Sequence, residues 1–187
     1  NIKWNSKNMN YHNYNISNWE DRQQTPAEDE VNGFLKHYDW SNNPNPDVLH
    51  IGIGCNRFYK ELQKHIEINY TGITYTIFEY EKVLPLQSCT YNPMLINKYN
   101  PILGNILKSY NCIVDVNITS YASSDLEALN YFNLLLHTLK VGGILCTHQM
   151  GLDYMRRGNI KQMLKDLKLN DRFSYHNTTG VGIIEKL

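Results

Sequence analysis

Short apolar runs alternate with helix-forming stretches from about residue 48 to the end of the chain, and this alternation limits the possible folds more than any other feature. Repeated strand–helix units predict a mainly parallel α/β sheet with helices on both faces and right-handed crossovers. Strands are expected over 48–53, 70–77, 93–98, 111–118 and 144–147. Helices are expected over 58–66, 79–86, 101–110, 124–139 and 161–169.

The two ends of the chain depart from this alternation. Residues 1–24 are rich in Asn, Tyr and Lys without a clear period, and we interpret them as an N-terminal arm before a single domain over 25–187. Thr25-Pro26-Ala27-Glu28 is typical of a helix start, with Thr as the N-cap and Glu three residues later. At the carboxyl end, FSYHNTT followed by VGIIEKL predicts an antiparallel hairpin.

Composition narrows the class of protein. Hydrophobic residues make up 42% of the 187 residues, as in globular domains. Lys plus Arg equals Asp plus Glu at 18 each, so net charge gives no reason to expect nucleic acid or an anionic membrane as partner. The four cysteines form no Cys-x-x-Cys pair, and we expect Cys112 and Cys146 to be reduced core residues. Without an evident signal peptide or membrane-length apolar run, we expect a cytoplasmic protein.

The first expected strand ends in Gly52-Ile53-Gly54, at the strand end where open α/β sheets bind ligands. Because glycine lacks Cβ, the main chain there can adopt positive φ and approach a ligand closely. A dinucleotide fingerprint needs glycine where Arg57 stands and an acid near Thr74, and a P-loop needs a following Gly-Lys-Ser/Thr. Both motifs fail, so the bend by itself leaves two readings open: a ligand-binding turn and a tight turn without a ligand.

Five segments, taken in order, resemble the class I S-adenosylmethionine-dependent methyltransferases over about residues 47–187. They are DVLHIGIG, YTGITYTIFEYE, YNCIVDVNI, LLHTLKVGGIL and VGIIEKL. The stretch LKVGGIL, 139–145, resembles the family's turn from a helix into the fifth strand. Gly72-Ile73-Thr74 resembles cyclopropane-synthase-like members, which carry Thr where most relatives have an acid. The resemblance implies a doubly wound, mainly parallel, Rossmann-like sheet with a C-terminal antiparallel hairpin.

The resemblance also implies a site for S-adenosylmethionine at the carboxyl edge of the sheet. The methionine end and sulfonium would lie across Gly52, Ile53 and Gly54, and the ribose would lie near Thr74. The adenine would lie near the turn after the third strand. Such a ligand needs no phosphate cradle, which agrees with the missing third dinucleotide glycine.

The sequence departs from the family pattern at three places around this implied site. His50 stands where many relatives have an acid, Asn56 replaces the usual third glycine, and residues 97–100 contain no acid for the adenine. Asn56 can still form hydrogen bonds near the methionine end. Glu79 would reach the ribose if the second strand ended a turn later than expected.

Candidate catalytic residues follow the fourth and fifth strands. Asp115 and Asn117 share a face if the strand alternation continues, and either would orient the acceptor. The alternative for Asp115 is a loop cap or a pair with a lysine. His148 is the general-base candidate, because imidazole titrates near neutral pH, although a structural or exposed histidine fits the same position. Asp115 and His148 would also suit a divalent metal, but no third ligand is visible, so no metal is assigned.

Methyl transfer from a sulfonium requires the protein to hold the acceptor in line and, for a hydroxyl, to remove its proton. We therefore expect S-adenosylmethionine-dependent methylation of a small-molecule hydroxyl or amine. Arg156 and Arg157 would hold an anionic acceptor, or they form a solvated helix start. The alternative function is a methyltransferase-like binding or assembly module without catalysis, which His50 and Asn56 favour. The sequence does not predict the oligomeric state.

Overall fold

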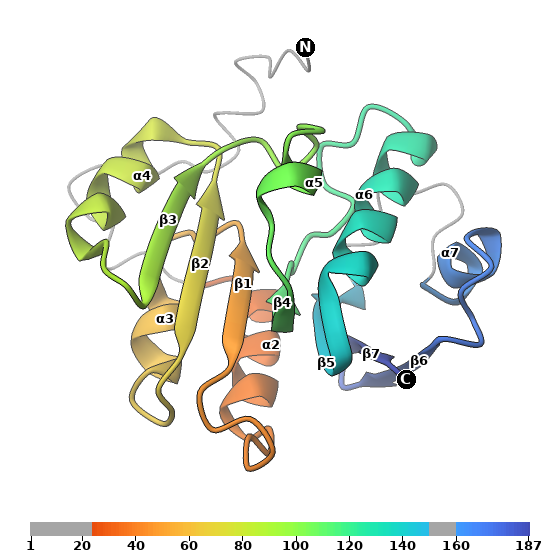
Figure 1. Cartoon of the computed structure of the whole chain (residues 1–187), viewed down its shortest axis with the longest axis horizontal. Helices are drawn as coiled ribbons and strands as arrows, with labels where there is room; N and C mark the ends of the chain where they lie inside the picture. The colour runs from red at the N-terminus through yellow and green to blue at the C-terminus, as the bar shows by residue number, and fades with distance from the viewer. Residues whose placement is uncertain (1–23, 150–159) are drawn as a thin grey trace.

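The computed structural model describes residues 24–149 and 160–187. The interpretation of residues 1–24 as an arm, and the role of Arg156 and Arg157, therefore fall outside the described residues, apart from Gln24 at the border. The strands are β1 (Asp47–Ile51), β2 (Asn69–Thr74), β3 (Tyr91–Leu95), β4 (Tyr110–Val114), β5 (Leu139–His148), β6 (Phe173–Thr178) and β7 (Val181–Lys186). The helices are α2 (Pro26–Lys36), α3 (Arg57–Leu62), α4 (Ile77–Val83), η2 (Leu84–Leu86), α5 (Leu103–Ile106), α6 (Asp125–Thr138) and α7 (Ile160–Asp166) (Figure 1).

These strands form one seven-stranded sheet in the order β3-β2-β1-β4-β5-β7-β6. Strands β1 to β5 pair in parallel, and β7 runs antiparallel to both β5 and β6. The expected doubly wound, mainly parallel sheet with a closing antiparallel hairpin is confirmed. The strand order reverses between β1 and β4, which are neighbours, and ligands of such sheets bind beyond the strand ends at this point.

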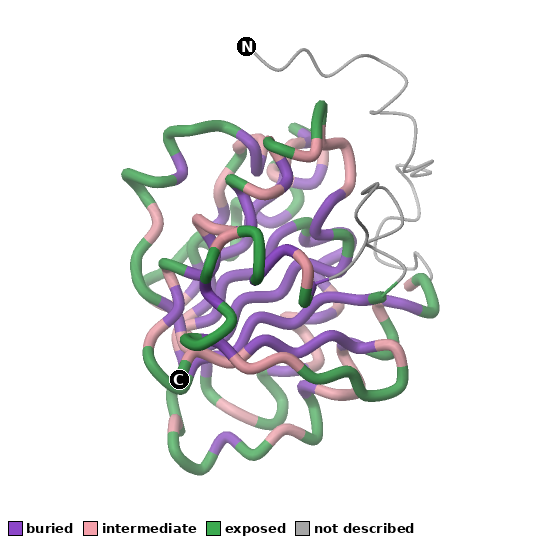
Figure 2. Tube along the Cα trace, turned by 90° about the vertical axis from the view of Figure 1, so that its right-hand side faces the viewer, coloured by how far each residue is buried: buried purple, intermediate pink, exposed green. Residues whose placement is uncertain are grey.

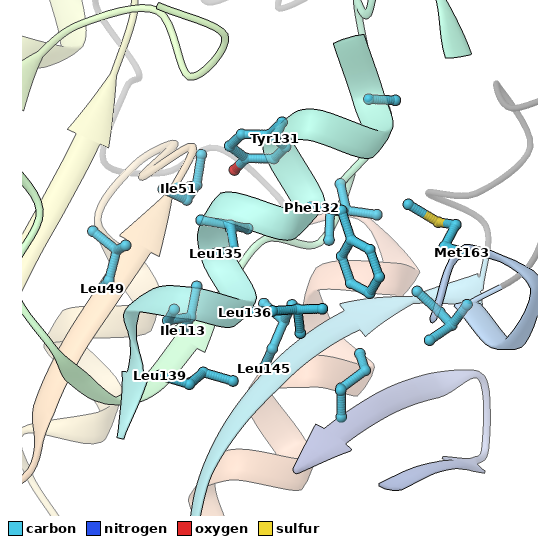
Figure 3. Packing of buried hydrophobic residues seen from close by; sticks show 14 of the residues in the cluster. Leu49, Ile51, Ile113, Tyr131, Phe132, Leu135, Leu136, Leu139, Leu145 and Met163 are labelled. Carbon is cyan, nitrogen blue, oxygen red and sulfur yellow. The ribbon is translucent and has the colours of Figure 1, made fainter. Parts of the chain in front are cut away.

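Two hydrophobic clusters, one on each face of the sheet, form the core. Helices α2, α3 and α4 cover one face, and α5, α6 and α7 cover the other. On the second face Phe132, Leu135 and Leu136 of α6 pack onto Ile113 and Leu145 of the central strands (Figure 3). Figure 2 shows the consequence, buried strands through the middle of the molecule and exposed residues mainly on the outer connections.

Local sequence signals correctly predict the start of α2. The Thr25 hydroxyl accepts a hydrogen bond from the Glu28 amide at 3.2 Å, and the Glu28 carboxylate accepts one from the Thr25 amide at 3.0 Å. This reciprocal pair satisfies two amides that the first helical turn leaves without partners. Pro26 occupies the first helical position, where the absence of an amide proton does no harm.

The first four strands end earlier than their apolar runs predict, with β1 ending at Ile51 and β3 at Leu95. The second was expected to reach Ile77 but ends at Thr74, because the Thr76 side chain caps α4, which begins at Ile77. The fourth was expected to reach Ile118 but ends at Val114. The run after β4 continues to be apolar because Val116 and Ile118 of the connection are buried, whereas Ile77 after β2 is exposed at the start of α4.

The stretch 139–145, which resembles the family's turn from a helix into the fifth strand, lies within β5, and so does its glycine pair Gly142-Gly143. The helix ends at Thr138, and β5 begins at Leu139 and runs through both glycines. Gly142 has a φ of +77°, and the register between β4 and β5 shifts at this place. A Cβ on Gly143 would lie 2.8 Å from the carbonyl oxygen of Lys140. The pair therefore permits an irregularity in the strand, as glycines in strands commonly do.

Two helices also differ from expectation. The helix expected over 101–110 is the single turn α5, which Pro101 precedes. Leu126 of α6, whose apolar side chain suggests a core position, is 65% exposed, because it lies two and a half turns before the buried Leu135 and therefore on the opposite side of the helix. Cys112 and Cys146 are free and buried, as expected. Within the described ranges, every helix falls short of the length and apolar character needed to cross a bilayer.

Candidate functional site

The bend after β1 is open at Gly52. Gly52 and Gly54 have φ values of +80° and +56°, which glycine adopts without steric penalty. The Gly52 amide donates to the Ile73 carbonyl at 2.8 Å, so the bend is fixed to β2. Gly52 is exposed, and a Cβ built on it would have no heavy atom within 4 Å. Neighbouring side chains therefore leave the main chain accessible at Gly52, whereas Ile53 is buried beneath it.

Asn56 ends the bend in the left-handed region, with a φ of +62°, and is fully buried. Its Oδ1 accepts a hydrogen bond from the Tyr91 hydroxyl at 2.8 Å, beneath α3. Its Nδ2 has no hydrogen-bond partner among the described residues. A buried donor without a partner costs about 1–3 kcal/mol. The Asn56 side chain is therefore buried, whereas Gly52 is exposed.

His50 lies inside the core on the same side of the sheet. Its Nδ1 is 2.8 Å from the Tyr70 hydroxyl, and its ring meets Phe58 edge-on with the centroids 4.7 Å apart. Complete burial lowers the pKa of His50 from 6.5 to about 3. His50 is therefore neutral near pH 7 and supplies no charge that could replace the acid found in many relatives.

Thr74 and Glu79 meet at the end of β2. The Thr74 hydroxyl donates a hydrogen bond to Glu79 Oε2, and the Thr76 hydroxyl accepts one from the Glu79 amide at 3.4 Å. Glu79 is buried in the first turn of α4. The sequence suggested that a longer strand would bring Glu79 to the edge. Instead the strand ends early, and the helix start brings the carboxylate back to the strand end.

Asp115 directly follows β4 and forms a buried ion pair with Lys98, at 3.0 Å between Nζ and Oδ2. The Tyr131 hydroxyl donates to the same Oδ2 at 2.7 Å. The Lys98 ammonium also donates to the Asn117 carbonyl at 2.7 Å. Burial lowers the pKa of Lys98, and Asp115 opposes part of this shift. The structure shows both structural alternatives for Asp115: the pair with a lysine and, through the Asn117 amide, a cap of the connection after β4.

Asn117 does not share a face with Asp115, because the strand alternation ends at Val114. The Asn117 amide turns back to donate to Asp115 Oδ1 at 3.2 Å, and its side chain is exposed. The carboxylate of Asp115 therefore accepts hydrogen bonds on both oxygens from within the chain. Of Asp115 and Asn117, only Asn117 has a side chain that faces solvent.

His148 is the last residue of β5, and its imidazole pairs with Glu30 of α2. Nε2 and Oε2 lie 2.5 Å apart, with His148 buried and Glu30 partly exposed. Gly180, in the β6–β7 turn, covers the pair so closely that a Cβ there would lie 2.8 Å from both atoms. Sequence reasoning missed Glu30, since no local signal relates residues 118 positions apart. A histidine oriented by a carboxylate is an arrangement that supports proton transfer.

Among residues 24–149 and 160–187, no group of three or more His, Cys, Asp or Glu side chains could hold a metal ion. The assembled carboxyl edge instead has an open glycine bend at its centre. The Thr74–Glu79 pair lies on the β2 side of the bend. The Lys98–Asp115 ion pair lies at the end of β4, and the His148–Glu30 pair lies at the end of β5.

Sequence comparison does not assign the chain: no protein-family model and no curated protein matches it. Solved structures do match. The N-methyltransferase NodS from Bradyrhizobium japonicum WM9, in complex with S-adenosyl-L-homocysteine, has a TM-score of 0.62 at 12% identity, over 90% of this chain and 93% of that chain. An O-methyltransferase family protein from Burkholderia thailandensis has a TM-score of 0.64 at 9% identity, over 95% and 61%.

MycE, a methyltransferase from the mycinamycin biosynthetic pathway in complex with Mg and S-adenosyl-L-homocysteine, has a TM-score of 0.58 at 16% identity. The match covers 87% of this chain and 49% of MycE, so the chain spans about half the length of that enzyme. Matches at such low identity establish architecture and not activity. The strand order, the closing hairpin and these matches together show that the chain has the Rossmann-like fold of the class I S-adenosylmethionine-dependent methyltransferases.

Proposed function

We propose that the chain binds S-adenosylmethionine at the carboxyl edge of the sheet and transfers its methyl group to a small-molecule hydroxyl or amine. The observation that carries the proposal is the open bend at Gly52, at the tip of β1 and beside the switch point with β4. NodS, which was solved with S-adenosyl-L-homocysteine, has the same fold over most of both chains and supports the choice of ligand.

The described residues fit the parts of such a ligand. The main chain at Gly52, Ile53 and Gly54 would contact the methionine end, since Gly52 presents backbone without a side chain. Thr74 and Glu79 would bind the ribose, because a carboxylate with an adjacent hydroxyl suits two vicinal hydroxyl groups. His50 and the side chain of Asn56 would support the bend from below without touching the ligand.

The cofactor would supply a methyl group on a sulfonium, which is already an activated donor. The chain's own residues would then position the acceptor and remove its proton. His148 is the proposed proton acceptor, and Glu30 would hold its ring and stabilise the imidazolium formed. Asn117, exposed at the end of β4, would orient the acceptor through its amide, while Asp115 stays paired with Lys98.

Isothermal titration with S-adenosyl-L-homocysteine tests the proposal, using two glycine variants as a matched pair. Gly52 and Gly142 have nearly equal φ values of +80° and +77°, and a Cβ on either meets nothing within 4 Å. Valine would therefore strain the backbone similarly at both. Only Gly52 lies at the carboxyl edge, because Gly142 lies near the beginning of β5.

We expect Gly52→Val to weaken binding by at least about tenfold, or about 1.4 kcal/mol, and Gly142→Val to leave affinity close to that of the native chain. Absence of binding to the native chain up to about 1 mM ligand would contradict the proposal. Equal affinity of the native chain and Gly52→Val would contradict the proposed position of the ligand.

One observation favours a second function, a non-catalytic binding module. Three hydrogen bonds from within the chain reach the buried Asp115 carboxylate, which favours a structural role for the acid after β4. In that case the native chain would fold and yet bind neither S-adenosylmethionine nor S-adenosyl-L-homocysteine. The titration above therefore separates the two functions.

A further inference from the structure

Lys98 lies in the connection from β3 to α5, and its ammonium lies in a different connection. Because β2 and β1 lie between β3 and β4 in the sheet, the chain after β3 passes both strands to reach α5 (Figure 1). The Lys98 side chain, which is 9% exposed, reaches the connection from β4 to α6 that contains Asp115 and Asn117. One buried side chain thus joins two connections at the carboxyl edge.

Four oxygen atoms of the β4–α6 connection surround the Lys98 ammonium. It donates to Asp115 Oδ2 at 3.0 Å, to the carbonyl oxygens of Asn117 and Ile118 at 2.7 and 3.2 Å, and to the Ser120 hydroxyl at 3.3 Å. An ammonium has three protons, so all of its donors are used within the chain. Because two of the four acceptors are main-chain carbonyls, Lys98 does more than neutralise one carboxylate.

The ion pair of Lys98 and Asp115 fixes the main chain of Asn117 on both sides. Asp115 Oδ1 accepts a hydrogen bond from the Asn117 amide at 3.2 Å, and Lys98 donates one to the Asn117 carbonyl at 2.7 Å. The same carbonyl accepts a hydrogen bond from the Ser120 amide at 2.9 Å, which closes a turn over 117–120. The exposed side chain of Asn117 therefore starts from a fixed point beyond the end of β4 and retains only its own rotations.

Two tyrosines hold this arrangement in place. Tyr131 of α6 donates to Asp115 Oδ2 at 2.7 Å, and Tyr99 donates to the Ser120 carbonyl at 2.6 Å. The Lys98 ammonium lies 5.1 Å from the ring centroid of Tyr131 and 5.3 Å from that of Tyr99, distances at which an aromatic ring attracts a cation. The position of Lys98 is therefore set by α6 and by its own connection as well as by Asp115.

From these contacts we infer that Lys98 is a positioning residue, which places the Asn117 side chain where it would orient the acceptor. This inference rests on the proposed function for the role of Asn117, and it extends that function to a residue whose donors are all used within the chain. The alternative is charge balance, in which Lys98 only compensates Asp115. The carbonyl contacts favour positioning, because loss of the ammonium removes a donor from Asn117 and its neighbour whatever the charge at position 115.

Two variants separate positioning from charge balance. Lys98→Met removes the cation, whereas Lys98→Met/Asp115→Asn removes both charges, a change that buried ion pairs often tolerate. The matched control is Lys140→Met, which breaks the more exposed Lys140–Asp47 pair at the opposite, amino edge of the sheet. Three quantities are measured on the isotope-labelled full chain: the urea midpoint, deuterium exchange of the Ser120 amide, and the side-chain amide resonances of Asn117.

We expect the double variant to regain most of the urea midpoint that Lys98→Met loses. In both Lys98 variants the Ser120 amide should exchange at least about tenfold faster than in the native chain, and the Asn117 side-chain resonances should shift. Lys140→Met should leave both readouts unchanged. Native exchange and native resonances in the double variant would overturn the inference and support charge balance, and so would equal effects of the Lys98 variants and Lys140→Met.

A measurement on the native chain tests the same inference without a variant. The ammonium protons of Lys98 should exchange with water at least about tenfold more slowly than those of Lys140, whose side chain is 40% exposed. Equal exchange of the two ammonium groups would show that Lys98 is not held by the carbonyls, and would overturn the inference. None of these readouts uses S-adenosyl-L-homocysteine, so failure of that ligand to bind refutes the proposed function separately.

Discussion

Acidification should destabilise the protein through the buried imidazole of His50. Burial lowers the pKa of His50 from 6.5 to about 3 in the folded chain, so the unfolded chain takes up a proton in a range where the folded chain does not. The contribution of neutral His50 to stability is fully present above pH 6.5 and is lost as the pH falls from 6.5 towards 3. Each pH unit well below 6.5 removes about 1.4 kcal/mol.

Between about pH 7 and about pH 5 the loss from this one residue is about 2 kcal/mol. Down to pH 5 this loss is set by the pKa of His50 in the unfolded chain, because His50 stays neutral in the folded chain throughout this range. The assay is urea denaturation followed by far-ultraviolet circular dichroism at both pH values, for the native chain and for His50→Gln. Glutamine retains a hydrogen-bonding group for the Tyr70 hydroxyl but does not titrate.

The pH dependence of the native chain should exceed that of His50→Gln by about 2 kcal/mol. Other carboxylates and histidines titrate in both proteins and cancel in the difference. If the two proteins lose stability equally over this range, His50 is protonated or accessible in the folded chain. The reasoning that places it in the core under α3 would then be refuted.

Three further substitutions test the packing that surrounds the site, each by the free energy of unfolding in urea. Lys98→Met leaves the buried Asp115 carboxylate without its cation and should destabilise by about 3–5 kcal/mol, and a loss below about 1 kcal/mol would show that the pair is solvated. Thr25→Ala removes the capping box and should cost about 1 kcal/mol, whereas no loss would mean that α2 starts elsewhere. Leu136→Ala should cost about 2–5 kcal/mol and Leu126→Ala less than about 0.5 kcal/mol, and the reverse order would contradict the orientation of α6.

Those features that depend on neighbours in sequence were predictable. The capping box at Thr25, the alternation of strands and helices and the closing hairpin all follow from short-range patterns, and each is present. The bend at Gly52 was found because two glycines after an apolar run have a specific conformational meaning, and both adopt positive φ.

The ends of elements were less predictable, because apolar runs do not stop where hydrogen-bonded strands stop. Thr76 caps α4 and ends the second strand, and the spacing of Thr76 and Glu79 is the local signal that could have predicted this end. After β4, the Asp115 carboxylate accepts a hydrogen bond from the Asn117 amide where the strand alternation was expected to continue. The helix α6 was predicted, but Leu126 lies two and a half turns before Leu135, on the side of the helix opposite the core residues, and is therefore exposed.

Side-chain pairs between distant segments could not be predicted at all. Glu30 meets His148 only because α2 packs against β5 and β7, and Lys98 reaches Asp115 from the connection after a different strand. One sequence contains no signal for such a partner, since each residue satisfies its local pattern equally well without it. His50 shows the same limit. Its place just before the bend predicted a contact with the ligand, but its ring contacts Tyr70 and Phe58, which come from other segments of the chain.

The central claim is that a ligand with the amino-acid tail of S-adenosylmethionine lies against the main chain at Gly52. The most direct test is titration of the isotope-labelled chain with S-adenosyl-L-homocysteine, following backbone amide shifts. The account predicts saturable shifts of residues 52–56 and of Thr74, with Gly142 and Gly143 unmoved at the opposite edge. Unchanged amides at 52–56, or shifts confined to another part of the molecule, would contradict it.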